Sequence, residues 1–426
     1  MTDCFVHASD LHLDAPLKNL GRFDAQTVEF LRSEARKAWP NLVDLTVQRE
    51  ASFLVLAGDL FDSAVAGYAA RRELTNGLER LNEKGISVFI VHGNHDPLTD
   101  DLRRRIGNLP KLTYVFDPGD PQTHEVDLKK SDGTAYVSGV SFSTRHERKN
   151  LAREFHSLDR PTGGPHIAVL HANLEGTTGH DNYAPCDEDD LAAAPVDYWA
   201  LGHIHLRSEP RLLAGGGWAA YSGNPQGRSS KTSECHPKGA LIVPIEDGLV
   251  GRPSFEPCDT VRFVRSRIDL EDDAGVAEAE EAVELKAEIV GREAGGRPVV
   301  WFPLIVGRSL EPATIQTALD KYLQGENDLG RHLNRGGPAK WTYDLRHLAS
   351  RDDLLGSGGL PATVLTRLGD HSAVRAAITE IATTLPGELT GLVTADDEAY
   401  EIADLHDEII RLTETLLISE IGQRDD

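Results

Sequence analysis

The sequence has few cysteines and no long apolar run. Its four cysteines, Cys4, Cys186, Cys235 and Cys258, lie far apart and none belongs to a CxxC pair. Neither a disulfide framework nor a structural zinc site is therefore indicated. No apolar stretch reaches the length of a membrane span, and the first residues lack the basic and apolar regions of a secretory signal. We expect a soluble cytoplasmic protein without a membrane partner.

The chain is also poor in positive charge. It has 44 Lys and Arg against 68 Asp and Glu, which gives a formal net charge of -24. This balance argues against a protein that binds nucleic acid mainly through a global basic field. A local basic path stays open, although solvated surface charge explains any single basic cluster equally well. The clusters are Arg103, Arg104, Arg105 and Lys111; Arg145, Arg148, Lys149 and Arg153; and Arg228, Lys231 and Lys238.

The length of 426 residues favours two or three domains. We predict a first domain over residues 1–258, a smaller α+β domain over 259–345 and a mostly helical region over 346–426. Apolar residues near the end, from Ile402 to Leu416, are spaced by three and four like a short heptad seam. This seam either packs on its own domain or docks a partner.

Apolar segments of strand length end repeatedly in residues that bind metals. The clearest is Phe53–Ala57, which stops at Gly58 and Asp59. Four other predicted strands end in the same way, and helical segments separate several of them. This order predicts an α/β fold with a site at the carboxyl ends of its strands. The residues at these ends are Asp10, His12, Asp59, Asn94, His171, His203 and His205, with His95 beside them.

The helical segments follow from apolar spacing and from proline and glycine positions. We predict helices over Asp24–Arg49, broken or kinked at Pro40, over Ala69–Lys84 with Gly85 as its stop, and over Arg145–Leu158. In the later part, helices are predicted over Ala274–Val290 and Pro312–Leu323.

The mixed set of carboxylate, imidazole and amide oxygen suits two divalent ions bridged by one carboxylate. Asp59 is the natural bridge because it follows the most apolar strand. Such a pair of ions activates water for in-line attack on phosphorus, so the predicted reaction is phosphoester hydrolysis. Each motif alone has a structural explanation, such as a turn or a hydrogen-bonded core histidine. Five of them at successive predicted strand ends make coincidence a poor explanation.

The five motifs resemble those of calcineurin-like metallophosphoesterases. The patterns D-x-H, GDxxD, GNHD, a lone His and GHxH are matched by Asp10 with His12, Gly58–Asp62, Gly93–Asp96, His171 and Gly202–His205. The resemblance implies a four-layer α/β sandwich, in which helices flank two facing mixed β-sheets. A smaller α+β capping domain and a helical C-terminal region would follow it.

The resemblance also implies a role for each matched residue. One ion would be held by Asp10, His12, Asp59 and His205, and the second by Asp59, Asn94, His171 and His203. His95 would contact the scissile phosphate or protonate the leaving oxygen, with Asp96 orienting its ring. Asp62 completes the GDxxD pattern but is needed by neither ion, so we assign it to supporting its loop through backbone hydrogen bonds.

In finer detail the chain resembles the SbcD and YhaO branch of DNA repair exonucleases. The resembling stretches are AGDLFD, IVHGNHDP, HDNYAPC, DYWALGHIH and YSGNPQGR, all within roughly the first 245 residues. The resemblance implies a manganese-dependent DNA exonuclease or endonuclease that works beside an SMC- or Rad50-like coiled-coil ATPase. Arg228 and Asn224 would bind the substrate. Iron, zinc and magnesium are alternatives to manganese, and a homodimer stays open.

Two other functions compete with the DNA nuclease. A phosphodiesterase or phosphatase for a small nucleotide or a phosphoprotein would suit the negative charge better. A non-catalytic scaffold that binds a partner would be expected to have lost at least one ligand, and the ligand set is complete.

Overall fold

The structure is a computed structural model that describes residues 2–63, 65–175, 182–325, 328–347, 363–364 and 366–367. Two compact units divide the chain: unit 1 comprises 1–266, 287–302 and 329–340, and unit 2 comprises 267–286, 303–328 and 341–426. The predicted three-part division stays a prediction, and the seam near the C-terminus lies outside the described residues. Among the described helices, none is long and apolar enough to cross a bilayer.

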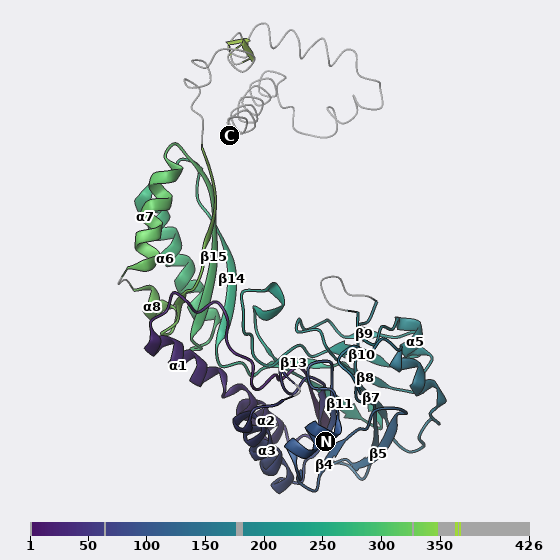
Figure 1. Cartoon of the computed structure of the whole chain (residues 1–426). Helices are drawn as coiled ribbons and strands as arrows, with labels where there is room; N and C mark the ends of the chain where they lie inside the picture. Colours follow the sequence, from purple (N-terminus) through teal and green to yellow (C-terminus); the bar gives the residue numbers. More distant parts are fainter. Residues whose placement is uncertain are drawn as a thin grey trace, which may run out of the picture. The chain divides into compact units, whose positions relative to one another are not determined.

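Two β-sheets form the centre of unit 1 (Figure 1). The first sheet has the order β12-β11-β1-β2-β3-β4, with β13 beside β11, and β1 to β4 run parallel. Its strands are β1 (Asp3–Ala8), β2 (Phe53–Ala57), β3 (Ser87–Val91), β4 (Thr113–Val115), β11 (Gly239–Glu246), β12 (Leu249–Val250) and β13 (Ser254–Pro257).

The second sheet has the order β5-β6-β7-β8-β10-β9. Its central strands β6, β7, β8 and β10 run parallel, and β5 and β9 are antiparallel at its edges. Both sheets are therefore mixed, as the resemblance implied. The strands are β5 (Gln122–Asp127), β6 (Thr134–Gly139), β7 (His166–His171), β8 (Tyr198–Gly202), β9 (Arg211–Leu212) and β10 (Trp218–Tyr221).

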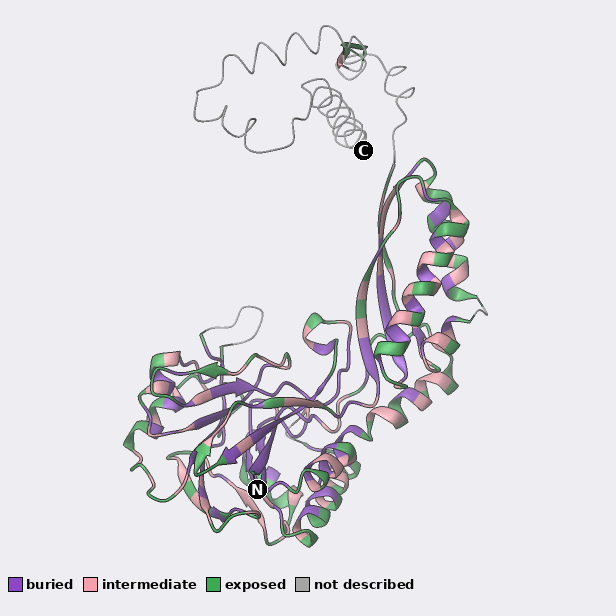
Figure 2. Ribbon diagram, turned by 180° about the vertical axis from the view of Figure 1, so that it is seen from behind, coloured by how far each residue is buried: buried purple, intermediate pink, exposed green. Residues whose placement is uncertain are grey.

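Successive side chains of β2 and β7 enter different cores, because side chains alternate across a strand. Val55 of β2 and Val169 of β7 belong to one core between the sheets. Leu54 packs with Leu78 in a second core under the helices, and Leu170 belongs to a third core behind the second sheet. Figure 2 accordingly shows these strands mostly buried. Two facing sheets with covered outer faces confirm the predicted four-layer arrangement, and double burial explains why β2 is an unbroken apolar run.

Helices and short turns cover the sheets of unit 1. They are α1 (Ala25–Ala35), α2 (Ala38–Gln48), α3 (Tyr68–Glu83), α4 (Asp100–Ile106), α5 (Glu188–Ala192) and the 3-10 helices η1 (Leu151–Ser157) and η2 (Thr232–Glu234). The predicted break in the first helix is confirmed but precedes Pro40, which lies in the first turn of α2, where a proline costs no intrahelical bond.

The helix predicted over Arg145–Leu158 is wrong in its first half, because only Leu151–Ser157 is helical and it is a 3-10 helix. The carbonyl of Glu147 accepts a hydrogen bond from the backbone N–H of Ala184 and is not used by a helix. A tertiary contact therefore replaces the local hydrogen bond that the helical composition predicted.

Between residues 262 and 347, the described part of the chain contains a third sheet and three helices. The sheet has the order β14-β15-β16, with β17 paired to β15. Its strands are β14 (Arg262–Asp269), β15 (Val299–Ser309), β16 (Gly337–Pro338) and β17 (Thr342–His347), and the helices are α6 (Val276–Glu293), α7 (Pro312–Gln324) and α8 (Leu329–His332). In unit 2, α7 begins at Pro312 as predicted and buries Ile315, Leu319 and Leu323 along one face.

The two sheets of unit 1 approach most closely where β2, β7 and β8 end. A Cβ atom at Gly202 would lie 1.7 Å from the carbonyl oxygen of Ala57. A Cβ atom at Gly58, whose φ is +92°, would lie 2.2 Å from Nδ1 of His171. These motif glycines are needed because two strand ends lie in direct contact there.

Substitution of Gly202 by alanine tests this contact. Gly202→Ala is expected to lower the free energy of unfolding by about 1–3 kcal/mol, because the opposing atom is a backbone oxygen in a packed sheet. The urea midpoint of the full chain, followed by tryptophan fluorescence, measures the loss. Gly21→Ala is the control, since nothing lies within 4 Å of a Cβ atom at Gly21. Equal midpoints for the two variants would contradict the close approach.

Candidate metal centre

The predicted ligands converge at the carboxyl ends of strands from both sheets. Asp10 and His12 follow β1, Asp59 follows β2 and Asn94 follows β3, whereas His171 ends β7 and both His203 and His205 follow β8. All are buried except His205, whose side chain is 23% exposed. Sequence positions almost 200 residues apart thus meet where the carboxyl strand ends of the two sheets come together, as predicted for a site of this fold class.

The ligand atoms form two overlapping groups. Those of Asp10, His12 and His205 lie within 4.8 Å of one another, and so do those of Asp10, Asp59 and His171. Asp59 Oδ2 also lies 3.7 Å from His12 Nε2 and 3.5 Å from His171 Nε2, within reach of both groups. Both aspartates therefore have the geometry of a bridge, and the assignment of that role to Asp59 stays a prediction.

The orientation of His171 fits a bound cation. Its Nδ1 lies 3.0 Å from the carbonyl oxygen of Ala57, so this nitrogen carries the proton and donates it. The lone pair of Nε2 then faces Asn94 Oδ1 at 3.0 Å and Asp59 Oδ2 at 3.5 Å. One nitrogen and two oxygen atoms with free lone pairs therefore face one another, and this arrangement favours a bound cation.

The group formed by Asp10, His12 and His205 also brings imidazole nitrogens close to a carboxylate oxygen. Nε2 of His12 and Nε2 of His205 lie 3.1 Å apart, and Nε2 of His205 lies 3.9 Å from Asp10 Oδ1. His203 contributes in another way, since its backbone N–H donates to the carboxylate of Asp10 at 3.2 Å and its ring centroid lies 5.2 Å from that of His171. The donor set fits two divalent ions of the kind that accept oxygen and imidazole ligands.

The backbone is strained at the residues that bear the ligands. Asp10, His12, Asp59 and His203 have φ values of 54°, 41°, 52° and 98°, in the left-handed region that non-glycine residues avoid. Each such residue costs on the order of 1–3 kcal/mol. Backbone hydrogen bonds from Asp10 to Gly58 and from His12 to Asp59, both 2.9 Å, help to hold these conformations. Strain of this kind is typical of functional sites.

Burial and neighbouring charges shift the pKa values of the residues in the centre. It raises the pKa of the Asp59 carboxyl to about 6. Burial also lowers the pKa of His12, so its ring stays neutral and can offer a lone pair. Burial alone would lower the pKa of His171, but the charges of Asp59 and Asp10 outweigh it and raise that pKa. A cation that binds between Asp59 and His171 therefore competes with protons.

His95 is held by Asp62 rather than by Asp96. Its Nδ1 lies 3.0 Å from the carbonyl oxygen of Asp62 and 3.5 Å from Asp62 Oδ1, which also lies 3.2 Å from His12 Nδ1. Asp96 instead is fully buried and accepts hydrogen bonds from Leu60 N, from Gly93 N and from the ring of His92. The contact to His95 is thus made by Asp62, which does more than support its loop, and the catalytic role of Asp96 stays a prediction.

The two residues predicted to bind substrate lie in different surroundings. Asn224 is fully buried, and its amide donates to the carbonyl oxygen of Gln226 and to Glu234 Oε2; its role in substrate binding stays a prediction. Arg228 lines the cavity at the metal centre and donates to the carbonyl oxygen of Leu11, and its role in substrate binding stays a prediction. No sequence motif pointed to Glu234, whose Oε1 lies 2.5 Å from His205 Nδ1.

A cavity of about 550 Å³ opens onto the centre. Its lining includes candidate ligands and His95. It also includes Lys18, Arg228, Lys231 and the serines at 229, 230 and 233, which are together called the cationic wall below. Two backbone contacts join the loops that carry these residues: Lys18 N donates to Arg228 O, and Ser230 N donates to Asn19 Oδ1. The cavity lining thus contains both metal-binding groups and cationic, hydroxyl-bearing side chains.

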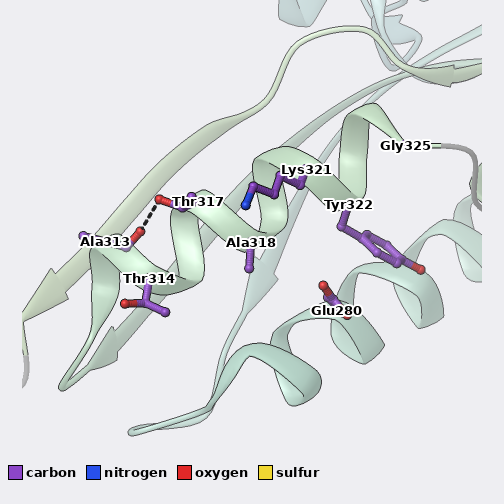
Figure 3. Close-up of a pocket in the computed structure, with 8 residues that line it drawn as sticks. All are labelled: Glu280, Ala313, Thr314, Thr317, Ala318, Lys321, Tyr322 and Gly325. Carbon is purple, nitrogen blue, oxygen red and sulfur yellow. Dashed lines mark hydrogen bonds between the residues drawn. The ribbon is translucent and has the colours of Figure 1, made fainter.

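A larger cavity of about 820 Å³ lies within unit 2 along α7 (Figure 3). It is lined by Glu280 of α6 and by Ala313, Thr314, Thr317, Ala318, Lys321, Tyr322 and Gly325. Thr317 donates to the carbonyl oxygen of Ala313, a hydrogen bond within the helix. The residues that line this cavity include one carboxylate and no histidine. The cavity of about 550 Å³ at the candidate ligands is therefore better suited to bind metal ions than this one.

Comparison with known proteins agrees with this geometry. The family profile of the calcineurin-like phosphoesterases matches residues 5–207, a span that includes every candidate ligand. This part of the chain is a calcineurin-like phosphoesterase domain. The calcineurin-like motifs from Asp10 to His205 are thus those that converge in the structure.

Individual relatives agree with the domain assignment. The uncharacterized metallophosphoesterase YhaO of Bacillus subtilis is 33% identical over 267 residues, which cover 62% of this chain and 63% of that protein. The DNA double-strand break repair protein Mre11 of Thermoplasma acidophilum is 25% identical over 285 residues, covering 63% and 68%. Mre11 of Archaeoglobus fulgidus is 25% identical over 304 residues, covering 68% and 65%. The chain therefore spans less than two thirds of the length of YhaO.

Replacement of Asp59 tests whether it bridges two ions. Asp59→Asn keeps the size of the side chain but removes its charge, so both ions should bind more weakly by at least about tenfold, or about 1.4 kcal/mol each. Phosphoester hydrolysis should be lost with them. Metal content after dialysis and a chelator-dye competition measure the two affinities. Asp190→Asn, a change at a buried carboxylate paired with Arg153, is the control. Loss of one ion alone would show that Asp59 is a simple ligand.

Replacement of His95 separates catalysis from metal binding. His95→Asn should lower turnover roughly 10²- to 10⁴-fold, the usual contribution of a general acid or base, with both ions retained. Initial rates on a phosphodiester and metal content are measured on the same preparation. A fall in metal content would show instead that His95 is a ligand.

Proposed function

We propose that this chain is a two-metal phosphodiester hydrolase that cleaves DNA as an exonuclease or endonuclease in DNA repair. The observation that carries the proposal is the complete set of seven candidate ligands at the facing strand ends of two sheets, beside a cavity whose lining includes the cationic wall. Relatives named as DNA double-strand break repair proteins support the choice of DNA. The sequence motifs and the convergence of their side chains support the predicted site residues.

The side chains of the centre can divide the chemistry among themselves. Two divalent ions bound there would neutralise phosphoryl oxygens and activate water. His95 lines the cavity and uses Nδ1 on Asp62, so its Nε2 is the nitrogen left to donate a proton to a phosphate or leaving oxygen. Lys18, Lys231 and Arg228 can hold neighbouring phosphates of a strand. Burial of the ligands keeps bulk water from competing for the site.

Manganese and a coiled-coil ATPase complete the proposal. Carboxylate, imidazole and amide oxygen ligands suit manganese, while iron and zinc fit the same donors. The ATPase partner rests on the resemblance to the SbcD and YhaO branch, and the cytoplasmic location stays a prediction.

A diesterase for a small nucleotide is the second candidate. The net charge of -24 favours it, and two of the three basic clusters are partly neutralised by ion pairs. Arg103 pairs with Asp117, Arg105 with Asp101 and Arg153 with Asp190. These arginines are therefore less available to bind the phosphates of a DNA strand. The proposal that the substrate is DNA then depends on the cationic wall of the cavity.

One experiment separates the two candidates. End-labelled duplex DNA and bis-p-nitrophenyl phosphate are each incubated with manganese, magnesium or a chelator. We expect manganese-dependent cleavage of both. The double variant Lys18→Ala/Lys231→Ala should raise KM for DNA and lower its logarithmic salt dependence by about 2 units, about 1 for each phosphate contact. The small ester should be cleaved as before, because it has no neighbouring phosphate.

The control removes two lysines elsewhere. Lys37→Ala/Lys84→Ala carries the same charge change at exposed positions that neither line the cavity nor belong to a basic cluster, and both substrates should be unaffected. Cleavage of the small ester alone by the unchanged chain would favour the nucleotide diesterase. Cleavage of neither by folded protein with bound manganese would contradict the hydrolase proposal.

A further inference from the structure

Glu234 contacts a ligand of the metal centre from outside. Its side chain is 8% exposed, and Oε1 lies 2.5 Å from His205 Nδ1. A ring nitrogen so close to a carboxylate carries the proton and donates it. Nε2 of His205, the atom that faces His12 and Asp10, then keeps its lone pair. The carboxylate thus decides which nitrogen of this half-buried ring is free to bind an ion.

The second oxygen of Glu234 holds the loop that follows β10. Oε2 accepts a hydrogen bond from Asn224 Nδ2 at 2.9 Å and another from Arg228 N at 3.0 Å. Arg228 lines the cavity, and its carbonyl oxygen accepts the bond from Lys18 N. One carboxylate therefore links a metal ligand to the cationic wall.

The surroundings of Glu234 fix this link in place. A Cβ atom at Gly227 would lie 2.1 Å from the carbonyl oxygen of Glu234. The loop that follows β10 is therefore in direct contact with the 3-10 helix η2, which ends at Glu234. Lys238 Nζ donates to the carbonyl oxygens of His205, at 2.6 Å, and of Ser233. The segment 233–238 holds both the backbone and the ring of His205, and Glu234 makes the contact to the ring.

We propose that Glu234 is a positioning residue that fixes the tautomer and orientation of His205 and so tightens the ion site of Asp10, His12, Asp59 and His205. The proposal rests on the proposed function, since it concerns the same centre. It predicts that this ion site, and not the one formed with Asn94, His171 and His203, depends on Glu234.

The test measures metal binding rather than activity. Glu234→Gln keeps the size of the side chain, but one amide group cannot accept from His205, Asn224 and the Arg228 N–H together. Apoprotein is titrated with manganese against a chelator dye. We expect one of the two dissociation constants to rise roughly 10- to 100-fold, the usual effect of losing a carboxylate behind a metal-bound histidine. The other constant should change by less than about threefold.

Two controls separate positioning from general stability. Asp190→Asn alters a carboxylate whose side chain is 6% exposed, against 8% for Glu234, but which binds Asn150 and Arg153; it should leave both constants unchanged. In a His205→Ala background, Glu234→Gln should have no further effect on the weakened constant. An equal effect with and without His205 would show a purely structural role and overturn the proposal.

The ring tautomer gives a readout without any metal. Nitrogen NMR of the apoprotein should show the proton of His205 on Nδ1. If the Glu234→Gln variant does not fold, Glu234→Asp, which keeps the charge, is used in its place. A proton on Nε2, or unchanged constants in folded Glu234→Gln, overturns the proposal. If the unchanged chain binds two ions but cleaves no phosphoester, the proposed function fails while the metal-binding test of Glu234 still stands.

Discussion

The structure depends most on the burial of two carboxylates against histidine lone pairs where the two sheets meet. Asp10 and Asp59 are almost inaccessible to solvent, and Asp59 accepts a hydrogen bond from the backbone N–H of His95 at 2.9 Å. Burying a carboxylate is expensive, which the raised pKa of Asp59 reflects. Cations at the centre would remove this cost, so metal binding and the stability of this sheet edge are coupled. The strained ligand loops and the motif glycines follow from the same requirement for close approach.

Orientation of the histidines is distributed over atoms far apart in the sequence. His171 is turned by the carbonyl oxygen of Ala57, His205 by Glu234 and His95 by the carbonyl oxygen of Asp62. In each case the supporting atom comes from a different strand end or loop than the ring. The ring positions are therefore properties of the assembled sandwich, and a change in any one loop alters the geometry of the whole centre.

The strands and the ligands could be predicted from the sequence because both leave local signals. Burial on two faces makes β2 and β7 continuous apolar runs, and the motif residues follow directly at their ends. The supporting contacts leave no such signal. Whether Asp62 or Asp96 reaches His95 depends on the path of a loop, and Glu234 lies 29 residues beyond the histidine that it orients. The helix predicted from Arg145 failed for the same reason, since Ala184 takes up the carbonyl of Glu147.

An acidic chain can still act on a polyanion, because the field that matters is local. Charges more than about 8 Å away are largely screened at physiological ionic strength. Much of the excess negative charge is therefore too distant to affect a phosphate in the cavity. The carboxylates that line the cavity are Asp59, Asp62 and Glu234, and two divalent ions would bring about four positive charges close to them. Because Lys18, Arg228 and Lys231 also line the cavity, a metal-bound cavity would be a cationic site in an acidic protein. Net charge then bears on how a polyanion approaches the chain, and the local field at the centre bears on whether a phosphate group binds there.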